Sequence, residues 1–217
     1  VPVSFAVGYA VKTSRSETLD SIRILADNNM YKNKLKYGKA MRLQTLEIVL
    51  SNLHTRYGRE MDHSERVSEL AVGIAELMRL PSHEIQSIRQ AGRLHDIGKI
   101  MVPPELLTKA GPLNEDEMRI VKKHPEIGYR ILKAVNEYAP LADYVLYHHE
   151  RWDGSGYPEG LAREEIPLIS RILCVADSFE AMTGGSPSRP KLSEAEARAE
   201  ILACAGTQFD PFIAKLI

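Results

Sequence analysis

Cysteine is scarce in this 217-residue chain, which contains Cys174 and Cys204. Two cysteines cannot form a disulfide framework, and their spacing fits no thiolate metal site. Both lie in apolar, helix-like surroundings. We therefore expect two small buried hydrophobic side chains in a reducing, cytoplasmic compartment.

The sequence also lacks a long hydrophobic run and an excess of either charge. No uninterrupted apolar stretch reaches the ~18 residues typical of a membrane span. The formal net charge is −1 at pH 7, which argues against polymeric nucleic acid as a partner. A small anionic ligand remains compatible, because a local cluster of Lys and Arg suffices. The chain begins at Val1 without Met, so we expect a piece of a longer protein, with any membrane anchor upstream.

Two regions differ in their hydrophobic pattern. Residues 1–12, rich in Val, Phe and Tyr, predict a strand, and apolar residues within 16–35 recur at helical spacing. One strand and one helix cannot form a core, so residues 1–40 look like the remnant of an interrupted domain with a connector helix. Residues 41–217 predict an all-α main domain. Its predicted helices cover 41–57, 64–79, 82–96, 114–123, 125–135, 139–150, 167–183 and 193–204.

Histidine is the informative residue type. The seven histidines occupy positions 54, 63, 83, 95, 124, 148 and 149. Five of them fall at predicted helix ends, where side chains from separate helices can converge. A single helix-end histidine is more often a partner of the helix dipole than a ligand. His148 and His149 are adjacent, and helical neighbours point ~100° apart, so both reach one ion only where the helix ends.

Asp177 lies within the apolar segment LISRILCVADSFEAM. A carboxylate buried there costs several kcal/mol unless it is paired or binds a metal. A salt bridge to a nearby Arg, or a missed N-cap, would also explain it. A His and Asp set without Cys suits Fe, Mn, Co, Ni or Zn in a hydrolytic site. Two ions about 3.5–4 Å apart, bridged by Asp96, would use the whole set and clamp a phosphate.

Five motifs together resemble the HD-GYP domain, a branch of the HD phosphohydrolase superfamily. They are His63-x-x-Arg66, HDIGK at 95–99, HPEIG at 124–128, HHERWDGSGYP at 148–158 and VADSFEAMT at 175–183. The resemblance covers about residues 44–217, in the family's order. It implies an HD-superfamily helical fold and hydrolysis of cyclic di-GMP to linear pGpG, to GMP or to both. A hydroxide bridging two divalent metal ions would attack, with Fe or Mn expected and Zn, Ni or Co as alternatives.

The resemblance also implies which residues hold the metals. The first ion would be bound by His63, His95, Asp96 and Asp177. The second ion would be bound by Asp96, His124, His148 and His149. Lys99 matches a family lysine that stabilises phosphate charge or protonates the leaving oxygen, although without the motif it would be taken as a surface lysine. Arg66 is expected to be a structural partner.

Two departures from the family pattern lie near the metals. Arg59 stands where some members have a Glu that binds a third metal, so we expect two ions. Glu60 and Asp62 are nearby and could supply a third site if the helix begins elsewhere. Glu180 replaces an Asp. Because Glu180 shares a helix face with Asp177, it could still assist proton transfer, with a longer reach.

The predicted substrate contacts lie in two segments. After helix 167–183 the family often has RPYRK, whereas this chain has SPSRPKLS. Ser188 replaces the tyrosine and Pro190 displaces Lys191, but Arg189 remains and could stack on or hydrogen-bond a guanine.

In loop 151–166, glycines and Pro158 would shape a segment beside the substrate phosphates. Gly156 is the glycine that precedes the tyrosine of this motif. Tyr157 would be a packing or lip contact, and Trp152 would pack beneath the loop.

The N-terminal residues resemble the last strand and helix of a GGDEF domain, through VSFAVGYAVK and ADNNMYKNKLKYGK. The signature loop of a cyclase is absent. This piece is therefore expected to transmit a signal from an upstream sensor or GGDEF domain of the full-length chain, or to act as a tether. A homodimer is also compatible.

Three alternatives to a cyclic di-GMP phosphodiesterase stay open. The substrate could be cyclic GMP-AMP or a simpler nucleotide phosphate, a reading motivated by the altered SPSRP segment. The domain could be a non-catalytic cyclic di-GMP sensor module. It could also be a helical scaffold whose histidines are incidental.

Overall fold

The computed structural model describes residues 7–30, 58–185 and 190–217. They fall into two compact units, with 7–30 in the first and the remainder in the second. The predicted helix 41–57 and most of the connector lie outside the described residues. Among the described helices, none combines the length and apolar character that crossing a membrane requires.

The N-terminal unit contains a helix over residues 19–30. Thr18 caps this helix, since its Oγ1 accepts the Ser21 backbone N–H at 3.1 Å. The strand prediction is wrong for residues 7–12, which have no strand assignment. An isolated strand has no partner for its backbone groups. Here the segment is held instead by the side chain of Asn29, which donates to the Tyr9 carbonyl at 3.0 Å.

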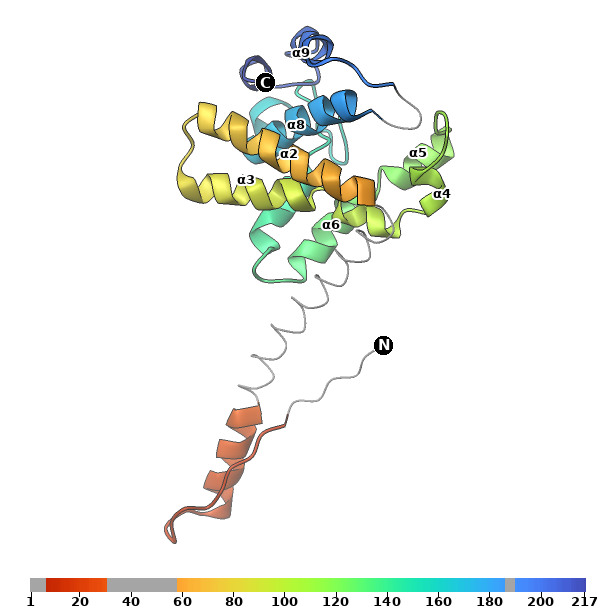
Figure 1. Ribbon diagram of the computed structural model, residues 1–217. Helices are drawn as coiled ribbons and strands as arrows, with labels where there is room; N and C mark the ends of the chain where they lie inside the picture. The colour runs from red at the N-terminus through yellow and green to blue at the C-terminus, as the bar shows by residue number, and fades with distance from the viewer. Residues whose placement is uncertain (1–6, 31–57, 186–189) are drawn as a thin grey trace. The chain divides into compact units, whose positions relative to one another are not determined.

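Three helices form the core of the second unit. Helix α2 (Gly58–Leu77) and α3 (Ser82–Leu94) form a hairpin, and α8 (Leu168–Gly184) packs against α2, as Figure 1 shows. The prediction of helices here is confirmed, except that α2 begins at Gly58 rather than at residue 64. Apolar side chains at helical spacing meet between the three helices. The largest fully buried side chains among them are Ile74, Ile88, Ile172 and Leu173.

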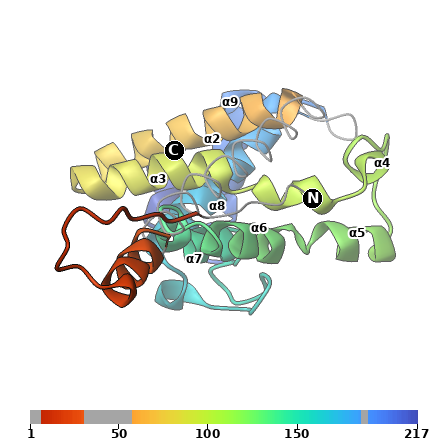
Figure 2. The ribbon, with the colours of Figure 1, turned by 90° about the horizontal axis from the view of Figure 1, so that it is seen from below.

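A second layer carries the remaining site helices, seen beside α3 and α8 in Figure 2. The 3-10 helix η1 (Ile97–Met101) follows α3 and packs on α6 (His124–Lys133), which also contacts α7 (Ala142–Leu146). A Cβ on Gly98 would collide with the carbonyl oxygen of His124. The glycine therefore permits the close crossing that brings the end of α3 to the start of α6.

The predicted single helix 139–150 is wrong in extent. It divides into η2 (Ala139–Leu141) and α7, which ends at Leu146, so the following residues form a turn. The predicted helices 114–123 and 193–204 are confirmed as α5 (Glu115–Val121) and α9 (Glu194–Ala203), and each begins with a capping box, at Asn114 and at Ser193. The remaining short elements are α4 (Pro104–Leu107), η3 (Arg163–Glu165) and η4 (Ile213–Lys215).

Candidate metal centre

Five histidines and two aspartates converge inside the second unit. They come from the body of α2, the end of α3, the start of α6, the turn after α7 and the middle of α8. In chain order they are His63, His95, Asp96, His124, His148, His149 and Asp177. Three overlapping groups of these residues bring their ligand atoms within 4.8 Å of one another. The structure thus brings together every residue predicted as a metal ligand.

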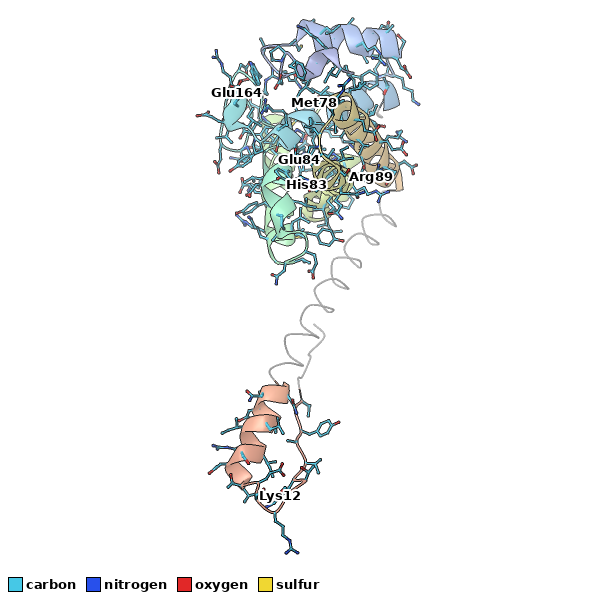
Figure 3. All side chains as sticks on the ribbon, turned by 90° about the vertical axis from the view of Figure 1, so that its left-hand side faces the viewer. Lys12, Met78, His83, Glu84, Arg89 and Glu164 are labelled. Carbon is cyan, nitrogen blue, oxygen red and sulfur yellow. The ribbon has the colours of Figure 1, made fainter. Side chains whose placement is uncertain are left out.

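The other two histidines do not join this cluster. His83, labelled in Figure 3, is exposed near the start of α3. His54 lies outside the described residues. The prediction that His63 stands at a helix start is wrong, because α2 already begins at Gly58 and His63 lies within it.

Three buried histidines are oriented in the same way. Each directs Nδ1 to the carbonyl oxygen three residues earlier: His95 to Gly92 at 2.7 Å, His124 to Val121 at 2.8 Å and His148 to Val145 at 2.6 Å. A carbonyl only accepts, so Nδ1 carries the proton and donates. In the neutral imidazole this tautomer leaves Nε2 with a lone pair toward the cluster, as in histidine ligands fixed by outer hydrogen bonds.

These Nε2 atoms are poorly satisfied without a cation. The Nε2 atoms of His124 and His148 lie 3.4 Å apart, and with both Nδ1 atoms protonated neither Nε2 has a proton to donate. His95 Nε2 is buried and forms no well-aligned hydrogen bond with the described residues, although Asp96 Oδ2 lies 3.1 Å away. An unmatched buried polar atom costs about 1–3 kcal/mol. A divalent cation would satisfy such lone pairs, so the donor set fits a metal.

The carboxylates concentrate negative charge at one side of the cluster. Asp96 Oδ2 lies 3.1 Å from His95 Nε2, and its Oδ1 lies 3.2 Å from His124 Nε2. Asp177 Oδ1 lies 3.1 Å from His63 Nε2. Burial alone would raise the pKa of Asp96, but the charges of His95 and Lys99 lower it well below its ordinary value. One carboxylate oxygen of Asp96 thus lies near His95 and the other near His124, as expected for a ligand that bridges two ions.

Ionisation differs between the two sides. Burial opposes the charge of His63, but hydrogen bonds to Asp177, Asp96 and Glu180 raise its pKa to about 12. Burial, and then the electrostatic effect of the neighbouring His124, lowers the pKa of His149 to about 3. The carboxylates around His63 therefore attract a cation, whereas His149 is a neutral imidazole.

Glu180 orients His63. His63 Nδ1 hydrogen-bonds Glu180 Oε2, and Arg66 Nε donates to Glu180 Oε1 at 2.6 Å. This chain of contacts turns His63 Nε2 toward Asp96 and Asp177. The geometry favours an orienting role for Glu180, in addition to the predicted help with proton transfer, and a structural role for Arg66.

Lys99 lies in η1, where its Nζ is 2.7 Å from Asp96 Oδ2. Its side chain is 17% exposed, so the ammonium is largely withdrawn from water. The pair places a positive charge directly beside the candidate bridging carboxylate. This position is compatible with the predicted contact to a phosphate oxygen.

Loop 151–166 borders the cluster through Tyr157, whose ring stacks on His149 with centroids 4.9 Å apart. Close packing explains the glycine at position 156, because a Cβ there would collide with the backbone of Glu150 and Arg151. The loop is fastened by Glu150, a buried residue that the sequence did not single out. Its Oε1 accepts the backbone N–H groups of Glu159 and Gly160 at 2.8 and 3.1 Å.

A second fastening comes from the C-terminal segment and was also missed. The Trp152 backbone N–H donates to the Gln208 carbonyl at 3.1 Å, and Arg151 Nη1 donates to Gln208 Oε1 at 2.7 Å. The Trp152 ring is partly buried, with the Arg171 guanidinium 5.7 Å from its centre. No local pattern indicates contacts over such sequence separations.

Some predicted residues fall outside the described part of the chain. Arg189 and Ser188 lie in the undescribed segment 186–189. The side chains of Arg59 and Glu60 are likewise not described, while Asp62 is exposed. The expected base contact and the number of metals therefore stay predictions.

Comparison with known proteins fits this geometry. The HD domain family matches residues 47–213, more than half of the chain. The chain belongs to the HD domain family. Members are metal-dependent phosphohydrolases, and the His and Asp cluster of this HD domain is able to bind metal ions.

Two curated relatives are similar to this HD domain. The cyclic di-GMP phosphodiesterase response regulator RpfG of Xanthomonas campestris is 41% identical over 77% of this chain and 45% of its own length. A cyclic di-GMP phosphodiesterase of Thermotoga maritima is 42% identical over 77% of this chain and 46% of its own length. The chain thus spans less than half of either relative.

Among solved structures, a cyclic GMP-AMP specific phosphodiesterase of V. cholerae matches with a TM-score of 0.55. It is 20% identical, and the match covers 71% of this chain and 42% of that chain. This likeness supports the helical HD fold.

Proposed function

We propose that this HD domain is a metal-dependent phosphodiesterase that hydrolyses cyclic di-GMP. The observation that carries the proposal is the set of buried imidazoles at His95, His124 and His148, each fixed by a backbone carbonyl so that Nε2 faces the cluster. Protein interiors rarely leave buried polar atoms such as these Nε2 atoms without partners. The names of the two curated relatives direct the proposal to cyclic di-GMP.

The chain offers ligands for two divalent ions, Fe or Mn first, with Zn, Ni and Co as alternatives. One ion would be held by His63, His95, Asp96 and Asp177, and the other by Asp96, His124, His148 and His149. When bound, a pair of divalent ions supplies water activation and neutralisation of phosphate charge.

The protein's own groups would do the rest. Lys99 would donate to a phosphate oxygen or protonate the leaving ribose oxygen, since its ammonium is held beside Asp96. Glu180 would keep His63 aligned. Tyr157, stacked on His149, would exclude water from one side of the bound phosphate.

Finer assignments belong to the same proposal. The motifs support membership of the HD-GYP branch, and residues 41–217 would be the catalytic domain. Residues 1–40 would be the end of a GGDEF-like domain that relays a signal from upstream. Gly156, Tyr157 and Arg189 would border the substrate.

Purified protein loaded with Mn²⁺ or Fe²⁺ tests the function. We expect linear pGpG, GMP or both from cyclic di-GMP, measured by chromatography, and less turnover of cyclic GMP-AMP. Faster hydrolysis of cyclic GMP-AMP would favour the alternative substrate. Metal-loaded protein that binds cyclic di-GMP without hydrolysing it would replace the enzyme by a sensor module.

A further inference from the structure

Lys122, the residue that follows α5, stands where two cavities meet. Its Nζ lies 4.9 Å from the centre of the Tyr157 ring, which stacks on His149. Lys122 and Tyr157 line both cavities: an inner one of about 230 Å³, also lined by His149, and an outer one of about 600 Å³. One aromatic ring thus separates the ammonium from a candidate metal ligand.

The outer cavity has a mixed lining. Apolar side chains come from Leu113, Met118 and Pro158. Charged side chains come from Glu115, Arg119, Lys122, Lys123 and Glu126. Two of them are engaged elsewhere, since Arg119 pairs with Asp116 at 2.9 Å and Glu126 with Arg130 at 3.6 Å. Apolar surface beside a few charged groups is what a nucleotide needs, because the base is flat and the phosphate is anionic.

Two cations line the inner cavity, and they differ in their commitments. Arg151 already donates Nε to Ser155 Oγ at 2.9 Å and Nη1 to Gln208 Oε1 at 2.7 Å. Lys122 contacts the Tyr157 ring and forms no ion pair with a carboxylate of the described residues within 4.0 Å. A lysine has three rotatable donors on a flexible stem, so its ammonium can turn to either cavity.

A cyclic dinucleotide has two phosphodiesters, of which one is cleaved. We propose that Lys122 binds the other, uncleaved phosphodiester and so selects ligands that carry two phosphates. This rests on the proposed function. The metal cluster holds the phosphate that reacts, and the second phosphate of the ring needs a cation outside that cluster. Lys122 supplies it where the two cavities meet, and the outer cavity receives one nucleoside half.

The test compares two substrates on the same metal-loaded protein. Cyclic di-GMP has two phosphodiesters, whereas bis(p-nitrophenyl) phosphate has one. For Lys122→Met we expect the ratio of kcat/KM for cyclic di-GMP to that for the single phosphodiester to fall at least about tenfold. The loss should lie mainly in KM. Lys122→Arg should restore most of it, and Lys215→Met removes an exposed lysine elsewhere as a matched control.

The outcomes separate this inference from the function on which it rests. Wild-type protein that cleaves the single phosphodiester but no cyclic dinucleotide would contradict the proposed function. Wild-type protein that hydrolyses cyclic di-GMP, with an unaltered substrate ratio in Lys122→Met, would overturn the role of Lys122 alone. Equal losses on both substrates would also overturn it, because they would show that Lys122 merely supports Tyr157 and His149.

Discussion

His124 and His148 face each other with their Nε2 atoms 3.4 Å apart, and each ring is fixed from behind by a backbone carbonyl. They come from the start of α6 and the turn after α7, two helices that pack together. Two lone pairs held face to face repel each other. The packing of the two helices therefore holds both Nε2 atoms in positions that a bound cation would stabilise.

Metal removal is expected to lower the stability of the domain. A ligand at 100 times its Kd stabilises a protein by about 2.7 kcal/mol, or about 5–10 °C in Tm for a domain of this size. Differential scanning fluorimetry with EDTA and with added Mn²⁺ measures this difference. His148→Gln should lose most of the response, while the exposed His83→Gln should keep it. An identical Tm with and without metal would contradict the assignment.

Asp96→Asn is expected to reduce metal content and to slow hydrolysis strongly. Asp96 contacts His95, His124 and Lys99, and the loss of a shared ligand costs several kcal/mol of charge stabilisation. That corresponds to roughly 10³-fold in kcat. Elemental analysis and turnover of cyclic di-GMP check it. Asp143→Asn, at an exposed pair with Lys133, is the control.

Much of the helical framework could be predicted because its signals are local. The capping boxes at Asn114 and Ser193 and the apolar run of α8 each lie within a few residues. The end of α7 was misplaced. The 139–150 segment begins with the 3-10 turn that contains Pro140, and α7 ends at Leu146 without a glycine or proline to mark its end.

The ligand types could also be predicted, but not how they are oriented. The histidine motifs lie in the sequence, whereas the anchoring carbonyls of Gly92, Val121 and Val145 are backbone groups without a sequence signature. The link from Glu180 to His63 spans 117 positions. Single-sequence patterns carry no information on which distant segments meet.

Glu180→Gln is expected to weaken metal binding without unfolding the domain. An amide keeps the shape but holds His63 and Arg66 less strongly. Loss of an outer partner of a metal-bound histidine typically costs 10–100-fold in affinity or activity. Competition with a fluorescent chelator measures it. Glu65→Gln breaks an exposed pair with Arg93 and is the matched control. Equal affinities in wild type and Glu180→Gln would contradict the orienting role.

Metal binding should release protons and tighten as the pH rises. The pKa of His63 is raised to about 12 and that of His95 to about 9, so both are protonated at pH 7.5 without metal. Ligation requires neutral imidazole, so we expect roughly one to two protons per chain. Calorimetry in two buffers of different ionisation enthalpy counts them. In the metal-free protein, the raised pKa of His95 stabilises the fold below about pH 6.5. That contribution is lost as the pH rises through about 9.

Gly156→Ala is expected to reduce hydrolysis and stability together. Its Cβ would push on the backbone of Glu150 and Arg151, next to His149, at a cost of about 1–3 kcal/mol. Gly73→Ala is the contrasting variant, because a Cβ there meets nothing within 4 Å. Removing a glycine from the interior of α2 should stabilise the fold by up to about 1 kcal/mol. Urea denaturation measures the change in the free energy of unfolding for both variants, which should fall for Gly156→Ala and rise for Gly73→Ala. A stable, fully active Gly156→Ala would show that loop 151–166 does not position His149.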